Sequence, residues 1–195
     1  MQALSALTEL DAVNIMLSTI GESPVSSLSA SESTVDVSLS RQILREVTIQ
    51  VQETGWHFNS EVNWPMTPTA DTGEIQIPAN CVQMDSSGAD AMLDVAVRGT
   101  RLYNRTARTF TFTKAITVDM ILLLDFTDIP QAARHYITIR AARVFQQRMV
   151  GSDTLGAFTE KDELRARAAL KKLDANTADY NILTGSWSVA RILTR

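Results

Sequence analysis

The sequence predicts an α+β fold, in which a four-helix bundle-like domain carries an inserted antiparallel β lobe. Apolar residues recur at helical spacing before residue 55 and again after residue 129, whereas between them the spacing changes to alternation. Helices and strands come in runs rather than one after the other, which argues against a doubly wound parallel sheet. We therefore expect a helical domain from residues 1–55 and 129–181, a β-rich lobe at 56–128 and a C-terminal tail at 182–195.

Two helices are expected before the β lobe. In the first, TELDAVNIMLSTIGE, Thr8 and Asp11 have the spacing of a capping box, and Gly21 is placed to end the helix. The second is ESTVDVSLSRQILREVTIQVQETG, with a Val or Ile or Leu every four residues and Gly55 at its end. The Ser-rich segment SPVSSLSASES between them predicts a loop.

Short runs with a period of two predict the strands of the lobe. These runs are EIQIP, CVQM, MLDVAV, RLYN, TFTF and TVDMILLLDF. Gly99 and Thr100 stand between two of them and fit a two-residue hairpin turn with glycine first. The last run is apolar on one side and partly apolar on the other, which is typical of a central strand.

Two further helices are expected after the lobe. The third begins near Asp128 and Pro130 and runs through HYITIRAARVFQQRMV. GSDTLGAF then predicts a loop, and TEKDELRARAALKKLDANTADYN predicts the fourth helix, with Thr159 and Asp162 at capping-box spacing. The last residues, ILTGSWSVARILTR, have no strong period and predict a tail with apolar anchors.

The third helix combines basic charge with apolar residues around most of its axis. From residue 129 to 152 there are four arginines and no acid. A helix that is apolar nearly all round is buried on several sides, by its own domain or by a neighbouring subunit. Its arginines then need carboxylate partners, which Glu160, Asp162 and Glu163 could supply within the chain or another subunit could supply across an interface. A DNA-reading helix would keep its basic side chains on an exposed face.

Composition narrows the function further. The net charge is −4, and the first forty residues contain no Lys or Arg, so stable binding to DNA phosphates is not expected. Arginine outnumbers lysine fourteen to four, a usage that favours interfaces. The single cysteine, Cys81, has no intrachain disulfide partner and no zinc-ligand pattern around it. The longest apolar run, MILLL, is too short to span a membrane, and the N-terminus lacks the basic region of a signal peptide.

No catalytic motif is recognisable. The chain lacks GxSxG, HExxH, P-loop and GxGxxG patterns, and its two histidines, His57 and His135, are expected to have structural roles. Asp119 and Asp125 stand out in the apolar last strand, where edge or turn carboxylates are the simpler interpretation. We expect no enzyme activity, no cofactor and no metal.

Several segments together resemble tail tubular protein A of short-tailed, podovirus-type phages. They include DAVNIMLSTIGESPVSSL, GWHFN, GEIQIPANC, RLYN, LLLDFTDIPQAARHYITIRAARVFQQRMVGS, FTEKDELRARAAL and DYNIL, in family order over nearly the whole chain. IGESPVSSL and IPQAARHYITIRAARVFQ are the most specific of them. The resemblance implies a structural virion protein.

The resemblance implies a dodecameric ring, a head–tail adaptor or gatekeeper, that joins the capsid portal to the tail nozzle and supports the tail fibres. Its implied partners are further copies of itself, the portal protein, tail tubular protein B of the nozzle and a fibre protein. Double-stranded DNA would pass through its channel during ejection without specific binding, and no membrane partner is implied. The implied location is the virion tail at the portal vertex, after assembly in the host cytoplasm. Candidate interface residues are Arg140, Arg143, Tyr180, Trp187, Arg191 and Arg195.

An alternative function stays open. A tail-associated glycan or peptidoglycan hydrolase, or a carbohydrate-binding protein, would also belong on a phage tail. A hydrolase of this kind needs a cleft with two carboxylates roughly 5–9.5 Å apart. A nucleic-acid-binding module would need a contiguous basic stripe, which the charge distribution opposes.

Overall fold

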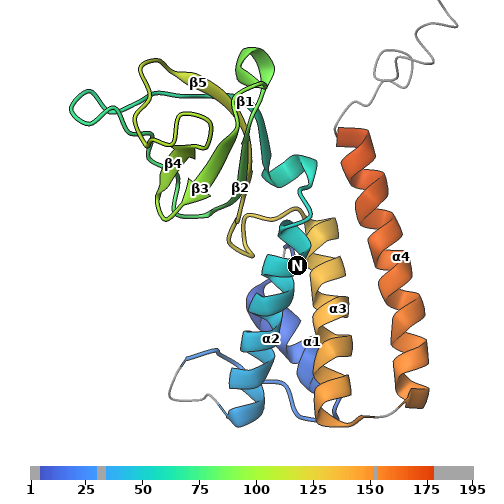
Figure 1. Ribbon diagram of the computed structural model, residues 1–195. Helices are drawn as coiled ribbons and strands as arrows, with labels where there is room; N and C mark the ends of the chain where they lie inside the picture. Colours follow the sequence, from blue (N-terminus) through green and yellow to red (C-terminus); the bar gives the residue numbers. More distant parts are fainter. Residues whose placement is uncertain (1–4, 30–33, 152, 178–195) are drawn as a thin grey trace, which may run out of the picture. The chain divides into compact units, whose positions relative to one another are not determined.

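A computed structural model describes residues 5–29, 34–151 and 153–177, and it confirms the mixed α+β class (Figure 1). The chain divides into two compact units: residues 1–40 with 130–195, and residues 41–129. The elements within the described residues are α1 (Glu9–Ser18), α2 (Val35–Gln52), η1 (His57–Asn59), β1 (Ser60–Met66), β2 (Cys81–Ser86), η2 (Gly88–Asp90), β3 (Val95–Arg98), β4 (Arg101–Asn104), β5 (Ile116–Leu122), α3 (Gln131–Met149) and α4 (Asp153–Thr177).

Helix α1 begins and ends as the sequence predicts. The Thr8 hydroxyl accepts the Asp11 N–H at 3.1 Å, and the Asp11 carboxylate accepts the Thr8 N–H at 3.0 Å, so the capping box is confirmed. These hydrogen bonds hold the pKa of Asp11 below its ordinary value. Gly21 follows the helix with a φ of +82°, a left-handed conformation that glycine adopts without a Cβ clash.

Helix α2 starts three residues later than the expected segment, at Val35, and crosses from one unit into the other. Its C-terminal end is tied to the chain that follows β5. The Gln52 side chain accepts the Leu124 N–H at 2.8 Å and donates to the Leu124 carbonyl at 3.0 Å. Gln52 is buried, and this pair of hydrogen bonds satisfies both ends of its amide.

The lobe contains a three-stranded antiparallel sheet in the order β1-β5-β2 and a separate β3–β4 hairpin. Strand β5 is central, as its apolar pattern predicts, with Val118 and Met120 buried. Gly99 has a φ of +64° in the turn between Arg98 and Arg101, so the predicted hairpin is confirmed. The core of the lobe is formed by Ile75, Ile77, Met84, Val95, Leu102, Phe112, Ile116, Val118 and Met120.

Other strand predictions are wrong in part. EIQIP and TFTF form only isolated bridges, Glu74 to Thr111 and Gln76 to Arg101 among them, because each pairs at single positions before the chain turns away. MLDVAV becomes a strand only at Val95. The last strand ends at Leu122 rather than at residue 126, since the next two backbone units bond to Asn80 and Gln52 instead of a neighbouring strand.

Strand β1 is absent from the sequence prediction. It contains Pro65, and five of its seven residues are exposed, so it has neither the composition nor the alternation of a half-buried strand. Its position at the edge of the sheet explains why proline is tolerated there, since an edge strand has one side without a partner. A bulge lies between Glu61 and Trp64, where Asn63 adopts a φ of +55°.

Helices α3 and α4 lie side by side in the helical unit, and α3 also packs against α1 (Figure 1). Helix α3 begins at Gln131, directly after Pro130, so the predicted start near Asp128 and Pro130 is confirmed. The expected loop GSDTLGAF is wrong, because α4 begins at Asp153 and Thr159 lies inside the helix rather than at its cap. A single glycine within a helix costs only about 1 kcal/mol, so Gly156 does not prevent the helix from starting earlier.

Candidate functional site

Arg140 and Arg143 of α3 share one carboxylate on α4. Arg140 Nη1 donates to Glu163 Oε1 at 3.1 Å, and Arg143 Nε donates to Glu163 Oε2. The Glu163 side chain is only 11% exposed, whereas those of Arg140 and Arg143 are 34% and 26% exposed. Because a carboxylate in this position would be costly without cationic partners, the pairing explains how α4 can bury Glu163. The structure therefore shows the intrachain pairing that the sequence left open.

Two buried polar atoms in and near this cluster have no hydrogen-bond partner among the described residues. Arg140 Nη1 also lies 3.4 Å from the Tyr136 hydroxyl, whereas its Nε is buried and has no hydrogen-bond partner. One turn further along α3, Gln146 Nε2 donates to the Thr19 carbonyl beyond the end of α1. The Gln146 Oε1 is likewise buried without a partner. The cluster carries two positive charges against one negative charge, so one net positive charge lies at the α3–α4 seam.

Helix α3 is buried on several sides within its own chain. Its buried residues are Ala133, Tyr136, Ile137, Thr138, Ala141, Ala142, Phe145 and Gln146. They cover most of the helix circumference, as the interleaved apolar pattern predicts. Packing against α1 and α4 accounts for part of this burial. A neighbouring subunit is therefore not required to explain the apolar composition of α3.

Among the described side chains of helix α4, residues 160–177, the buried ones lie along one seam. In its described side chains, only Glu163, Ala166 and Leu170 are buried, and their spacing places them on one side of the helix. On a different side lie Leu164, which is 59% exposed, and the exposed Ala168 and Ala175. Leu164 and Ala168 are four residues apart and Ala175 continues their row, so they form an outward stripe on α4 in which the exposed Lys171 stands between the two alanines.

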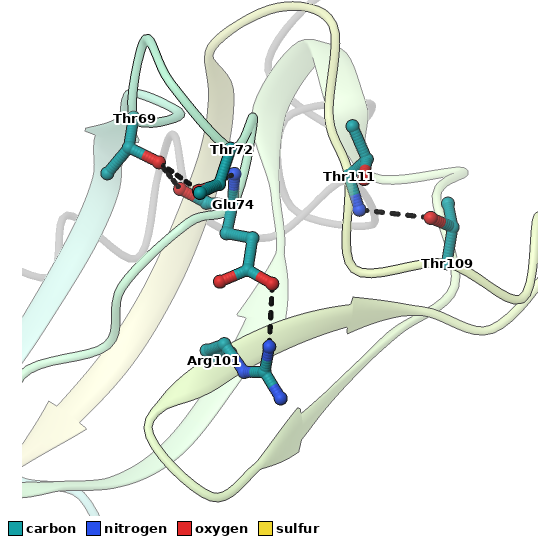
Figure 2. A network of polar contacts seen from close by, with 6 residues as sticks. All are labelled: Thr69, Thr72, Glu74, Arg101, Thr109 and Thr111. Atoms are coloured by element: carbon teal, nitrogen blue, oxygen red, sulfur yellow. Dashed lines mark hydrogen bonds and ion pairs between the residues drawn. The ribbon is translucent and has the colours of Figure 1, made fainter.

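The β lobe displays an arginine–aromatic group on the outer face of the β3–β4 hairpin. Arg98 lies over the Tyr103 ring, 3.7 Å from its centre, and Arg101 lies over the Phe110 ring at 4.3 Å. The two rings meet edge to face with their centres 4.9 Å apart. Figure 2 shows the Glu74 carboxylate reaching Arg101, where Oε1 accepts from Nη1 at 2.6 Å. Sequence reasoning missed this group, although Arg101 and Tyr103 alternate within the predicted strand RLYN.

The side chains that sequence reasoning considered for catalysis are exposed or have structural surroundings. His57 and His135 are both exposed, on η1 and on α3. Asp119 accepts the Asn63 N–H at 2.8 Å and so supports the bulge of β1. Burial raises the pKa of the Cys81 thiol, which opposes formation of a reactive thiolate. Within the described ranges there is no group of three or more His, Cys, Asp or Glu side chains that could hold a metal ion.

Four of the candidate interface residues lie outside the described residues, namely Tyr180, Trp187, Arg191 and Arg195. They fall in or beside the tail predicted from residue 182, so their contacts stay a prediction. In the portion of the chain that is described, no helix is both long enough and apolar enough to cross a membrane.

Comparison with known proteins connects this chain to phage tails. The family described as tail tubular protein matches residues 10–180, a range that covers most of both units and includes Arg140, Arg143 and Glu163. The chain is also similar to tail tubular protein A of Klebsiella phage KP34. The two are 29% identical over 158 residues, which cover 80% of this chain and 82% of that protein.

Proposed function

The chain belongs to the tail tubular protein family and is a structural protein of the phage tail, and from this premise we propose that it forms a dodecameric ring between the capsid portal and the tail nozzle. In this proposal the ring supports the tail fibres and surrounds a channel through which DNA is ejected. It has no catalytic role.

The outward stripe of α4 carries this proposal. A ring built from identical subunits uses two different patches on each subunit, because the contact is heterologous. Helix α4 has 25 residues, and its described side chains are buried only along the seam of Glu163, Ala166 and Leu170, so the stripe of Leu164, Ala168 and Ala175 is open to a neighbour. Small residues such as alanine let a second helix approach closely, and Leu164 at one end of the row supplies apolar area.

Charge supports the same role. The net charge of −4 gives a channel protein little attraction for DNA phosphates, so DNA can pass without being held. The first forty residues carry acids but no Lys or Arg, whereas the later helices carry arginines. Neighbouring subunits that bring these two regions together would gain electrostatic complementarity.

We assign the partners by domain. The helical domain, residues 1–55 and 129–181, is proposed to form a bundle of four helices that contacts neighbouring subunits and the portal. The lobe at 56–128 is proposed to contact tail tubular protein B and the fibres, and the tail at 182–195 to reach along the portal. Arg140 and Arg143, which are partly exposed beside Glu163, are proposed to border the subunit interface. The ring would lie at the portal vertex of the virion after assembly in the host cytoplasm.

The mass of the assembly tests the ring. We expect the full chain to form a dodecamer with the portal protein, measured by native mass spectrometry or sedimentation. Leu164→Glu should raise the concentration needed for assembly by about tenfold or more, the effect of about 1.4 kcal/mol per contact. Met92→Glu is the matched control, because Met92 is 97% exposed in the lobe and lies outside the proposed contact. Equal assembly of both variants, or a chain that stays monomeric with portal present, would refute the proposal.

The tail is tested separately. Truncation after Tyr180 should weaken attachment to the portal while the helical and β signals in circular dichroism stay unchanged. Portal binding measured by co-sedimentation gives the answer, and unchanged attachment would remove the tail from the proposed interface.

A further inference from the structure

The β3–β4 hairpin has an outward face whose charges are arranged unusually. Arg98 and Arg101 are directly opposite each other across the hairpin, a placement in which like charges destabilise a strand pair. Arg101 is neutralised by Glu74. Arg98 is exposed and, within the described part of the chain, it makes no hydrogen bond or ion pair, while its guanidinium lies over the Tyr103 ring. An exposed guanidinium that is held in place by a ring and has no acceptor can donate hydrogen bonds to an acceptor group on another molecule.

From this arrangement we propose that the outer face of the hairpin, formed by Arg98, Arg101, Tyr103 and Phe110, docks an acidic peptide segment of another protein. The inference goes beyond the proposed ring, since it does not depend on how many subunits assemble.

The Tyr103 ring prepares the Arg98 guanidinium for a carboxylate, whereas Arg101 is already paired with Glu74. A guanidinium lying on a ring loses side-chain freedom before binding, so less entropy is lost when a ligand arrives. Its N–H groups lie in its own plane, and contact with a ring at one face leaves them available for a bidentate carboxylate. Arginine, tyrosine and other aromatic residues are also the types that contribute most at protein interfaces.

The alternative ligand, a nucleic acid, fits this face poorly. Arg101 is paired with Glu74, and Arg105 is paired with Asp94 at 3.4 Å, so Arg98 and Arg108 are the arginines of residues 98–108 without a carboxylate among the described residues. Tight duplex binding uses on the order of 6–10 phosphate contacts. On the hairpin face Arg98 is the guanidinium without a carboxylate among the described residues, which falls far short of that number but can hold a carboxylate of a peptide.

Single strands of nucleic acid are disfavoured for a second reason. Their bases bind by stacking on open aromatic faces. Tyr103 and Phe110 are each half-buried, each carries a guanidinium on one face, and they meet each other edge to face. Half-burial and a guanidinium on one face of each ring leave little open ring surface for a base to stack on.

Fluorescence anisotropy with the full chain tests the proposal. The probes are a labelled glutamate–serine repeat peptide, a glutamine–serine repeat of equal length and oligothymidylate. We expect the wild type to bind the glutamate peptide more tightly than the other two, and Arg98→Gln to weaken that binding by about tenfold, as expected for about 1.4 kcal/mol. Arg167→Gln, which removes an exposed arginine from α4, is the matched control and should leave binding unchanged.

A second variant tests whether binding requires the planar guanidinium of Arg98 or only its positive charge. Arg98→Lys keeps the positive charge but cannot form the planar fork, so it should weaken binding nearly as much as Arg98→Gln. Circular dichroism checks that each variant folds. Retained binding in Arg98→Lys, equal losses in the Arg98 and Arg167 variants, or no binding of the glutamate peptide would overturn the proposal. Tighter binding of oligothymidylate that Arg98→Gln abolishes would replace it with a nucleic-acid surface. None of these results depends on ring assembly, which is measured by mass.

Discussion

Replacing Glu163 with glutamine should destabilise the helical unit by about 2 kcal/mol. Removing one partner of a fully buried ion pair costs about 3–5 kcal/mol, whereas an exposed pair contributes about 0–1 kcal/mol. Glu163 is nearly buried, but the arginines that it pairs with keep a quarter to a third of their side chains exposed, which places the cluster between these limits. Glutamine keeps the shape and one acceptor oxygen, and it leaves Arg140 and Arg143 without a counter-charge at the seam.

The change should be visible in thermal unfolding followed by circular dichroism at the helical wavelength. For a chain of this size, a loss of about 2 kcal/mol lowers the Tm by about 4–8 °C. Asp162→Asn is the matched control, because Asp162 is 59% exposed and pairs with an 80% exposed Arg165 at 3.4 Å. That control should stay within about 0.5 kcal/mol of the wild type.

A double variant identifies the cause. Arg143→Gln combined with Glu163→Gln removes one of the guanidinium groups that Glu163→Gln leaves unpaired. The double variant should therefore lose less unfolding free energy than the sum of the losses in the two single variants. A Glu163→Gln variant that is as stable as Asp162→Asn would refute the reasoning. It would show that the partial exposure of the arginines lets water replace the carboxylate at no cost.

Two further predictions concern a turn and a cap. Gly55→Ala should lower the free energy of unfolding more than Gly99→Ala. Both glycines have positive φ, so alanine is strained by about 1–2 kcal/mol at either position. Only at Gly55, of these two, would the new Cβ also meet a neighbour, Ile121 Cδ1 at 2.8 Å. Urea unfolding of the two variants measures the difference, and equal losses would contradict the contact. Asp11→Asn should lower stability at pH 7 by about 1 kcal/mol or less, because a neutral amide oxygen replaces the charged carboxylate that accepts from Thr8 in the capping box. The folded pKa of Asp11 is below its unfolded value, so its contribution is present above about pH 4 and is lost as the pH falls through the folded pKa. The difference in unfolding free energy between wild type and Asp11→Asn should therefore become smaller towards pH 3. A difference that stays constant with pH in urea unfolding would count against the linkage.

The parts of the fold that local chemistry determines could be predicted from the sequence. The capping box of α1 needs only Thr8 and Asp11 at the right spacing, and the β3–β4 turn needs only Gly99 between two alternating runs. Strand β1 could not be predicted in this way, because its exposed residues and Pro65 are tolerated only through its position at the edge of the sheet. That position depends on β5, which lies more than fifty residues further along the chain.

The candidate site was predictable to a similar extent. A basic helix followed by TEKDEL indicates that a carboxylate will meet Arg140 or Arg143, yet spacing cannot show that Glu163 serves both. The hairpin face needed a tertiary contact. Phe110 comes from an irregular segment after β4, and only its packing on Tyr103 and beneath Arg101 brings the two arginines and two rings together.

The two arginine groups differ in what they can offer a partner. On α3, Arg140 and Arg143 already share Glu163, so a new carboxylate would compete with an intrachain pair that fixes α4. On the hairpin, Arg98 has a ring beneath it and no carboxylate among the described residues, so a partner's carboxylate would displace only water. The two groups therefore use arginine for two separate physical reasons. It follows that Glu163→Gln should loosen α4 without changing binding of the glutamate peptide, whereas Arg98→Gln should change that binding without altering helix stability.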